Sequence, residues 1–304
     1  MRPETRLFAI FGILVLCAAA AAPDVSAQRR LGGGMGGGGM GGGGMGGSPR
    51  GDSGGAPAEG GPSPEIAGAF IPMRARLPQM EARGFLATGL KAIYPADADC
   101  LPIVSPFASP TRHDGSKRSP RFYQGLHGGS DIAAPDGTPL IAIADGTVVH
   151  KGEGENIGGI GLMLQHAPAD TGLAVWLYTE YKHLKEQSGL EVGSRVRMGD
   201  KVGEAGNTGT TGGRAYGEEG FYHLHWTAFV SDGPEYKAMR MFIPVGGRWI
   251  DPLAVFLRDP LNSKDVRELP DDRKRVRIAY RSTDGRTVPE DAHIIWPIAC
   301  TPKG

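Results

Sequence analysis

The sequence of 304 residues predicts a mainly β protein with an all-β central domain over residues 99–258 and few helices. Short runs of β-branched and aromatic residues alternate with glycine turns, as in "TPLIAIADGTVVHKG" at 138–152, where Asp145-Gly146 predicts a hairpin. Two more apolar runs, "GIGLMLQHA" and "GLAVWLYTEYKHL", stand on either side of the turn "PADTG". Helical periodicity is confined to residues 64–98, where Pro72 and Pro78 predict that any helix is short.

The first 27 residues have the pattern of a secretory signal peptide. Arg2 and Arg6 precede the apolar run 7–22, and Val25 and Ala27 place small residues at the −3 and −1 positions of a cleavage site. The apolar run is shorter than the roughly 20 residues that a membrane span needs. We therefore expect an exported protein, periplasmic, bound to the cell envelope or secreted, with no integral membrane segment after the signal is removed.

Residues 28–63 are dominated by glycine, methionine and proline, as in "GGGMGGGGMGGGGMGG" at 32–47. Such a segment cannot bury enough apolar surface to fold. It predicts a disordered, flexible tether. The chain then continues as an N-terminal segment with short helices at 64–98, the β domain at 99–258 and a short C-terminal extension at 259–304.

Removal of the signal peptide would also remove Cys17 and leave only Cys100 and Cys300. An even pair of cysteines in an exported chain predicts one disulfide. This bridge would tie the C-terminal extension back to the β domain.

Charge gives no indication of a polyanionic partner. Lys and Arg total 33 residues, and so do Asp and Glu, and no basic tract is present. We therefore predict no nucleic-acid partner and no binding to an anionic surface. The oligomeric state stays open.

The segment "GFYHLHWTAF" at 220–229 sets His223 and His225 two residues apart in an apolar run. Side chains at i and i+2 of a strand share a face, so both imidazoles face one way while Leu224 and Trp226 face a core. Two adjacent imidazoles suit a metal site or an acid–base site. A pair of hydrogen-bonded histidines without a catalytic role fits this segment equally well.

Two other segments supply further polar groups of the same kind. "GLHGGSDIAAPDGTP" delivers His127 and Asp131 across two glycines that let the backbone turn tightly. With an imidazole from the strand, they make three protein ligands, the number typical of a catalytic Zn²⁺ whose fourth position is open to water. "YTEYKHLKE" adds His183, which strand alternation places on the same face as Tyr181. The remaining histidines lack a partner at ligand spacing, and we expect no role in the site for His113, His150, His166 and His293.

In this order the motifs resemble those of the lysostaphin- and LytM-type zinc endopeptidases, which cut peptidoglycan peptides. The matching segments span about residues 99–256 and are "HGGSDIAAPDGTP", "ADGTVV", "YKHL", "GNTG", "HLH" and Asp251-Pro252. The resemblance implies a two-layer antiparallel β fold with the site in a groove, Zn²⁺ as the cofactor and a peptidoglycan peptide as the substrate.

The resemblance also implies a role for each polar residue. It makes His127, Asp131 and His225 the zinc ligands and leaves His223 and His183 unligated beside the metal-bound water. We assign the general base to His223 and the stabilisation of transition-state charge to His183, two roles that can be exchanged. The stretch "TTGGRAYGEEGFY" before "HLH" is longer than the family's pattern, and we expect the loop at 208–220 to form a wall that selects the substrate.

Three functions fit these features. The first is an exported zinc metalloendopeptidase that hydrolyses the peptide cross-links of peptidoglycan. The second is a non-catalytic LytM-like regulator that binds and activates another cell-wall hydrolase, but such relatives have lost ligands, whereas all five polar positions are present here. The third is a peptidase for glycine-rich bridges, which would be liable to cleave this chain's own tether. The sequence favours the first and does not identify the peptide bond that is cut.

Overall fold

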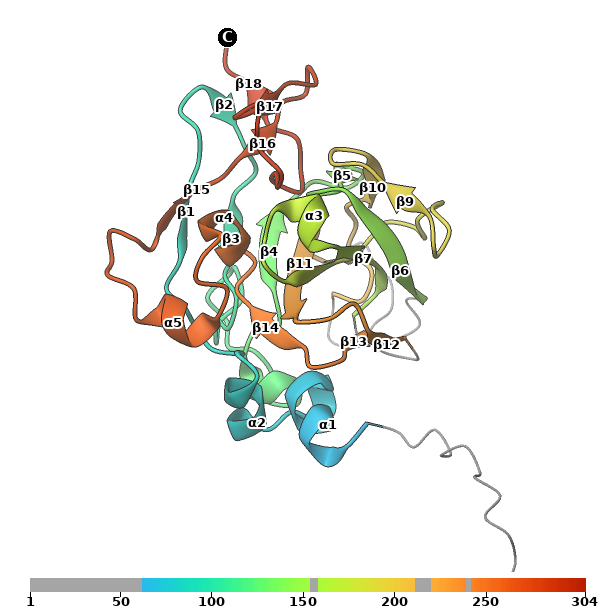
Figure 1. Ribbon diagram of the computed structural model, residues 1–304, viewed down its shortest axis with the longest axis vertical. Helices are drawn as coiled ribbons and strands as arrows, with labels where there is room; N and C mark the ends of the chain where they lie inside the picture. The colour runs from blue at the N-terminus through green and yellow to red at the C-terminus, as the bar shows by residue number, and fades with distance from the viewer. Residues whose placement is uncertain (1–61, 154–157, 211–219, 239–241) are drawn as a thin grey trace, which may run out of the picture. The chain divides into compact units, whose positions relative to one another are not determined.

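The centre of the structure is an eight-stranded antiparallel sheet (Figure 1). Seven strands lie side by side in one continuous order, and the eighth strand pairs with β11 in addition to the two neighbours that β11 has in that order. In spatial order the seven are β3 (Ile103–Ser105), β4 (Ser130–Ala133), β11 (His223–Ser231), β8 (Trp176–Lys182), β7 (Ile160–His166), β6 (Gly146–Glu153) and β9 (Arg195–Val196), and the eighth is β14 (Arg248–Ile250). The predicted class, a mainly β protein with antiparallel strands, is confirmed.

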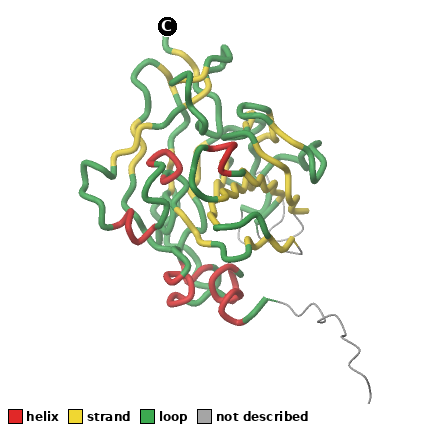
Figure 2. Tube along the Cα trace, in the orientation of Figure 1, coloured by secondary structure: helices red, strands yellow, loops and turns green. Residues whose placement is uncertain are grey.

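In the part of the chain that the structure describes, five two-stranded sheets and several short helices surround the central sheet (Figure 2). The strand pairs are β1 (Lys91–Ile93) with β15 (Arg275–Arg277), β2 (Ala98–Asp99) with β18 (Thr301–Pro302), β5 (Pro139–Ile141) with β10 (Lys201–Glu204), β12 (Tyr236–Ala238) with β13 (Phe242–Pro244), and β16 (Tyr280–Arg281) with β17 (Thr287–Val288). The helices are α1 (Pro64–Phe70), η1 (Pro72–Arg74), α2 (Leu77–Ala82), η2 (Tyr123–Gly125), α3 (Pro168–Thr171), α4 (Ala254–Leu257) and α5 (Ser263–Arg267).

The computed structural model describes residues 62–153, 158–210, 220–238 and 242–304, which belong to one unit, Ala58–Gly304. The predicted signal peptide and nearly all of the predicted tether lie outside the described residues. Within them, no helix combines the length and the apolar character that a membrane crossing requires. The helices predicted for residues 64–98 are present and are short, as the prolines require.

Two separate hydrophobic cores cover the two faces of the sheet. Alternation along β11 sends Leu224 and Trp226 into one core and Phe229 into the other. The second core joins the sheet to the N-terminal helices, because Phe70 and Trp249 both pack on the Phe229 ring, at centroid distances of 5.9 and 4.5 Å. The strand that carries the histidine pair is therefore held from both sides.

The C-terminal extension is part of the first core. The predicted Cys100–Cys300 disulfide is present, with a Cα–Cα distance of 4.4 Å. In the same core, Trp296 is fully buried, and its ring lies 5.8 Å from that of Trp226. The backbone N–H of Ile295 donates to the Ile143 carbonyl, which continues the hydrogen bonding into the β domain. Residues near the C-terminus thus support the strand between His223 and Ser231.

The hairpin predicted at Asp145-Gly146 is wrong, although both runs are strands. β5 pairs with β10, whereas β6 lies between β7 and β9. Gly146 is needed for another reason, because a Cβ at this position would lie 2.7 Å from His166 Nδ1. The glycine therefore makes room for a buried imidazole, a close approach that a sequence pattern does not distinguish from a tight turn.

His166 is a structural histidine, as the sequence predicted. It is fully buried, donates Nδ1–H to the Asp145 carbonyl over 2.7 Å and contacts Thr179 Oγ1 through Nε2 at 2.8 Å. Burial lowers the pKa of His166 to about 4, although the bond to Asp145 opposes the shift. The imidazole is thus neutral in the folded protein at pH 7.

We expect His166 to make stability depend on pH. The unfolded chain takes up the proton near pH 6.5 and the folded chain only near pH 4, so the contribution is complete above pH 6.5 and is lost as the pH falls toward 4. The loss is at most about 3 kcal/mol. In urea titrations across this range, His166→Asn should lower stability at pH 7 and flatten the decline.

Asp251 is a second buried group that makes stability depend on pH. Burial raises its pKa to about 6, so its contribution rises as the pH falls and has the opposite sign. Because Asp251 is the same in both proteins, it cancels in the difference. Equal pH slopes for the wild type and His166→Asn would contradict the assignment.

Candidate active site

The register between β4 and β11 brings the polar motifs together. Asp131 lies directly opposite His225, and Ala133 lies opposite His223. Directly opposed residues of an antiparallel pair have Cβ atoms about 4.5–5.5 Å apart. The carboxylate of one motif and the imidazole of the other are therefore neighbours, although 94 positions separate them.

Three ligand atoms converge at this point. His127 Nε2 lies 2.9 Å from Asp131 Oδ1 and 3.0 Å from His225 Nδ1, and the latter two atoms are 2.9 Å apart. Ligands at 2.0–2.1 Å from a tetrahedral Zn²⁺ lie about 3.3 Å from one another. The three atoms are thus close to the spacing that a bound metal needs, and together they form one of the candidate metal clusters of the described residues.

The tautomer of His127 supports a cation at this point. Its Nδ1–H donates to the Pro106 carbonyl over 3.0 Å, so in the neutral ring Nε2 carries a lone pair. This lone pair faces a carboxylate oxygen, and two acceptors at 2.9 Å require a proton or a metal ion between them. A backbone carbonyl that orients a ligating imidazole in this way is typical of metal centres.

The site favours a neutral His225 and a neutral His183 beside one ionised carboxylate. Burial lowers the pKa of His225 to about 3, and burial together with the neighbouring His223 and His225 holds the pKa of His183 well below its usual value. Burial alone would raise the pKa of Asp131, but the charges of His127 and His223 outweigh it and keep this pKa well below the usual range. Neutral imidazole and carboxylate are the forms that bind metals.

The prediction that Tyr181 and His183 share a face is wrong. Tyr181 points into the first core and donates its hydroxyl to the Ile141 carbonyl. His183 follows the end of β8 with a φ of 62°, a left-handed conformation that reverses the alternation. Its ring therefore reaches the opposite face, 4.7 Å from the ring of His223 and 5.5 Å from that of His225.

Backbone carbonyls fix the orientation of both remaining histidines. His183 donates Nδ1–H to the Thr208 carbonyl over 2.6 Å, and His223 donates Nδ1–H to the Phe221 carbonyl over 2.8 Å. In the neutral rings, both Nε2 atoms are therefore proton acceptors. Nε2 of His223 lies 3.3 Å from Asp131 Oδ1, at the edge of the ligand triad.

Arg118 and Ser105 belong to the site but carry no sequence signal. Arg118 Nη2 donates to Asp131 Oδ2 over 3.2 Å and to Ser105 Oγ over 2.7 Å, while its Nε donates to the Thr111 carbonyl. Oδ2 is thereby occupied and Oδ1 is left for the triad. Arg118 stands 13 positions before Asp131 in a polar loop, and no spacing rule marks such a contact.

The surroundings of Gly129 explain why the His127-to-Asp131 motif has a glycine at this position. A Cβ at Gly129 would lie 2.8 Å from His225 Nε2 and 2.6 Å from the Trp226 carbonyl oxygen. A side chain here would displace the imidazole. The glycine is therefore needed for the close approach of the two segments, in addition to the turn.

Two predictions about the surroundings of the site have different outcomes. The ring of His113 stacks at 3.7 Å on Phe221, whose carbonyl orients His223, so His113 lies at the rim and outside the ligand cluster. Most of the loop predicted to select the substrate, residues 211–219, lies outside the described residues.

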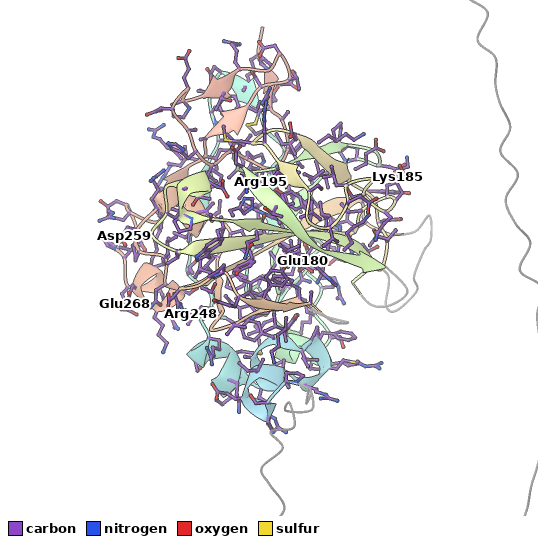
Figure 3. All side chains as sticks on the ribbon, turned by 45° about the vertical axis from the view of Figure 1, so that its right-hand side comes forward. Glu180, Lys185, Arg195, Arg248, Asp259 and Glu268 are labelled. Carbon is purple, nitrogen blue, oxygen red and sulfur yellow. A yellow bond between two sulfur atoms is a disulfide. The ribbon has the colours of Figure 1, made fainter. Side chains whose placement is uncertain are left out.

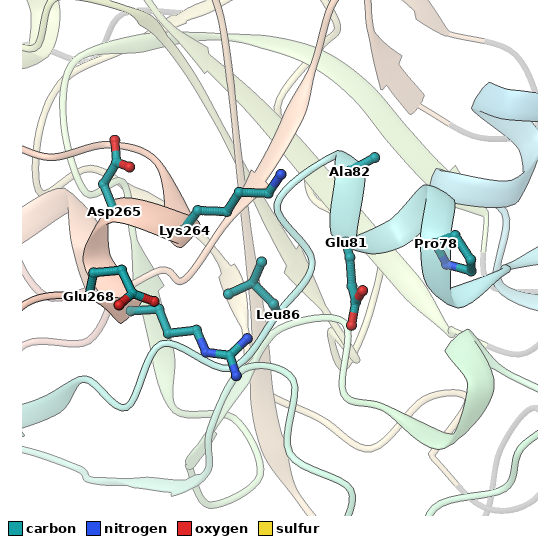
Figure 4. A pocket seen from close by; sticks show the side chains of 8 residues that line it. Pro78, Glu81, Ala82, Leu86, Lys264, Asp265 and Glu268 are labelled. Carbon is teal, nitrogen blue, oxygen red and sulfur yellow. The ribbon is translucent and has the colours of Figure 1, made fainter.

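The described cavities lie elsewhere. One of about 540 Å³ opens between α2 and α5 (Figure 4). Another of about 600 Å³ is lined by residues of β1 and β15. None of the five candidate site residues lines either cavity.

Comparison with known proteins finds a family match within the β domain. Residues 125–235 match the sequence model of peptidase family M23, and all five candidate site residues fall within this range. For this segment, the match confirms the resemblance of the motifs to the lysostaphin- and LytM-type peptidases.

Two relatives show how far the likeness extends. The DD-carboxypeptidase/endopeptidase Mpg of Neisseria meningitidis is 36% identical over 109 residues, covering 36% of this chain and 21% of that protein. The peptidoglycan DD-endopeptidase ShyA of Vibrio cholerae is 31% identical over 119 residues, covering 39% of this chain and 24% of that protein. The chain thus spans about a fifth to a quarter of the length of these relatives.

Solved structures of the same type are also similar. The catalytic domain of lysostaphin from Staphylococcus simulans is 23% identical, covering 50% of this chain and 86% of that domain with a TM-score of 0.32. A zinc-containing peptidase from Vibrio cholerae is 25% identical, covering 52% of this chain and 37% of that one with a TM-score of 0.33.

We expect Arg118 to tune metal affinity through Asp131. Without the Arg118 guanidinium, Asp131 Oδ2 loses its hydrogen-bond donor and the carboxylate is no longer held in one orientation. Loss of a residue that orients a metal ligand typically weakens metal binding about 10–100-fold. Arg118→Met should therefore release a bound divalent metal to a chelator more readily, and Arg118→Lys should retain part of the affinity.

Arg112 supplies the matched control for this prediction. It lies in the same loop and donates to Ser116 Oγ and to the Lys117 carbonyl. Arg112→Met should keep the affinity of the wild type. Equal metal retention by Arg118→Met and the wild type would show that Asp131 needs no such support.

Proposed function

We propose that this protein is a zinc-dependent endopeptidase that hydrolyses peptide cross-links of peptidoglycan outside the cytoplasm. The observation that carries the proposal is the convergence of His127 Nε2, Asp131 Oδ1 and His225 Nδ1 beside two further imidazoles, within an M23 peptidase domain. Two imidazoles and one carboxylate are a ligand set typical of catalytic zinc.

The names of the relatives support the choice of substrate. Two of the relatives are named as a DD-carboxypeptidase/endopeptidase and a peptidoglycan DD-endopeptidase. Peptidoglycan lies outside the cytoplasm, which agrees with the signal peptide expected at residues 1–27. A non-catalytic regulator would have no need for five retained polar groups, so we do not favour that function.

The residues divide the chemistry between them. His127, Asp131 and His225 would hold the zinc, which when bound polarises the scissile carbonyl and lowers the pKa of water to about 7. His223 accepts the proton of the attacking water at Nε2, because the Phe221 carbonyl holds its Nδ1–H. The same ring then delivers this proton to the leaving amine.

His183 stabilises charge as the reaction proceeds. Its Nδ1–H is held by the Thr208 carbonyl, so Nε2 is the atom that can take up a proton. Burial keeps the pKa of His183 low, and the ring is therefore neutral until negative charge develops next to it. The second proton of the attacking water can be shared with this Nε2 as the tetrahedral group forms, which favours the transition state over the bound substrate.

Digestion of isolated sacculi tests the function directly. The zinc-loaded protein should lower the fraction of cross-linked fragments and raise that of uncross-linked fragments, as mapped by mass spectrometry. A chelated sample should leave the profile unchanged, and added Zn²⁺ should restore cleavage. An unchanged fragment profile with the zinc-loaded protein would contradict the proposal.

Substitution of the two strand histidines should separate ligand from base. Loss of one of three ligands removes tight binding, so His225→Ala and Asp131→Ala should lose both zinc and activity. His223→Ala should keep zinc and lose turnover by about 10²–10⁴-fold, the usual contribution of general acid–base catalysis. Zinc analysis of the purified variants beside their turnover rates is the measurement.

The outcome that would refute this division is specific. If His223→Ala emptied the site as completely as His225→Ala, then His223 would be a ligand. The second candidate cluster of His183, His223 and His225 would then describe the metal site better.

A further inference from the structure

Two charged residues of β8 lie on the sheet face that carries the candidate active site. Lys182 is directly opposite His225 in the β8–β11 ladder, and Glu180, which is labelled in Figure 3, is opposite Thr227. Because opposed residues share a face, the two side chains stand on the side of His225, whereas Tyr181 between them points into the core. Neither Glu180 nor Lys182 has a part in the chemistry proposed above.

The pair is partly buried and is held together. Lys182 Nζ lies 3.0 Å from Glu180 Oε2, and the two side chains are only 29% and 16% exposed. An ammonium has three N–H donors, so one bond to Glu180 leaves two for another acceptor. Among the described residues, no other acidic group lies within ion-pair distance of Lys182.

The neighbouring strand leaves the lysine accessible. Gly161 of β7 lies opposite Lys182, and a Cβ at this position would approach the lysine Cγ to 3.3 Å. Since the glycine has no side chain, nothing from this position of β7 covers the lysine.

We propose that Lys182 is a specificity-determining residue that binds a carboxylate on the substrate residue next to the scissile bond, with Glu180 holding the ammonium in place. This inference rests on the proposed peptidase function. One peptide residue spans about 3.3–3.6 Å, so a residue adjacent to the scissile bond lies about as far from the metal ligands as Lys182 does from His225. A charge-assisted bond then favours acidic stem peptides over glycine bridges, which carry no such carboxylate.

Two synthetic cross-linked peptides test this assignment. They differ only at the residue next to the scissile bond, whose carboxylate is free in one peptide and amidated in the other. The zinc-loaded full chain should cleave the free acid with a kcat/KM about tenfold higher, as expected for one charge-assisted bond. Lys182→Met should bring this ratio close to one while its zinc content stays at the wild-type value, and Lys182→Arg should keep part of the preference.

Lys185 provides the matched control. It is an exposed lysine three positions away whose ammonium pairs with Asp136 at 2.9 Å, and it is labelled in Figure 3. Lys185→Met should retain the full preference for the free acid. If Lys185→Met and Lys182→Met changed the ratio equally, the effect would come from general charge, and the assignment would be overturned.

The remaining outcomes separate this inference from the proposed function. Cleavage of both peptides at equal rates by the wild type, or an undiminished preference in Lys182→Met, would overturn the role of Lys182 and leave the peptidase function standing. Failure of the zinc-loaded wild type to cleave either peptide or sacculi would overturn both.

Discussion

The placement of Asp131 opposite His225 is the constraint on which the site depends. A shift of one residue between β4 and β11 would send Asp131 or the histidine pair into the first core, because the side-chain period of a strand is two. A carboxylate that is only 6% exposed also requires partners on both oxygens. Arg118 bonds to Oδ2, and the imidazoles surround Oδ1. Gly129 then permits the close approach that these contacts need.

Residues outside the family-matched region hold this register in place. β11 lies between two cores, with Trp226 against Trp296 on one side and Phe229 against Trp249 on the other. The N-terminal helices contribute to one core and the C-terminal extension to the other, and the Cys100–Cys300 disulfide closes the latter. The predicted domain, residues 99–258, contains all five candidate site residues, while the packing that keeps His223 and His225 in position extends well beyond it.

Sequence reasoning predicted the parts of the site that depend on local periodicity. The i, i+2 histidine pair follows from strand alternation, the mainly β class from turn spacing, and the disulfide from the even cysteine pair. Three features could not be predicted from the sequence, each for a physical reason. The left-handed backbone at His183 reverses the alternation, and one φ angle leaves no trace in a hydrophobic pattern. Arg118 reaches Asp131 through space from a polar loop. Gly146 accommodates His166 across two strands and forms no hairpin.

The charges of the site explain how Asp131 can be the only negatively charged group of the ligand triad. His225 and His183 are kept neutral by burial, so Asp131 supplies the single negative charge of the triad. Arg118 offsets part of that charge through Oδ2 without competing for Oδ1. A divalent cation held by such a set would keep most of its positive charge for the substrate carbonyl and the attacking water, which is the requirement for a strong Lewis acid. Nε2 of His223 lies at the same edge and is a neutral proton acceptor, so it adds no negative charge that would weaken such a cation as a Lewis acid.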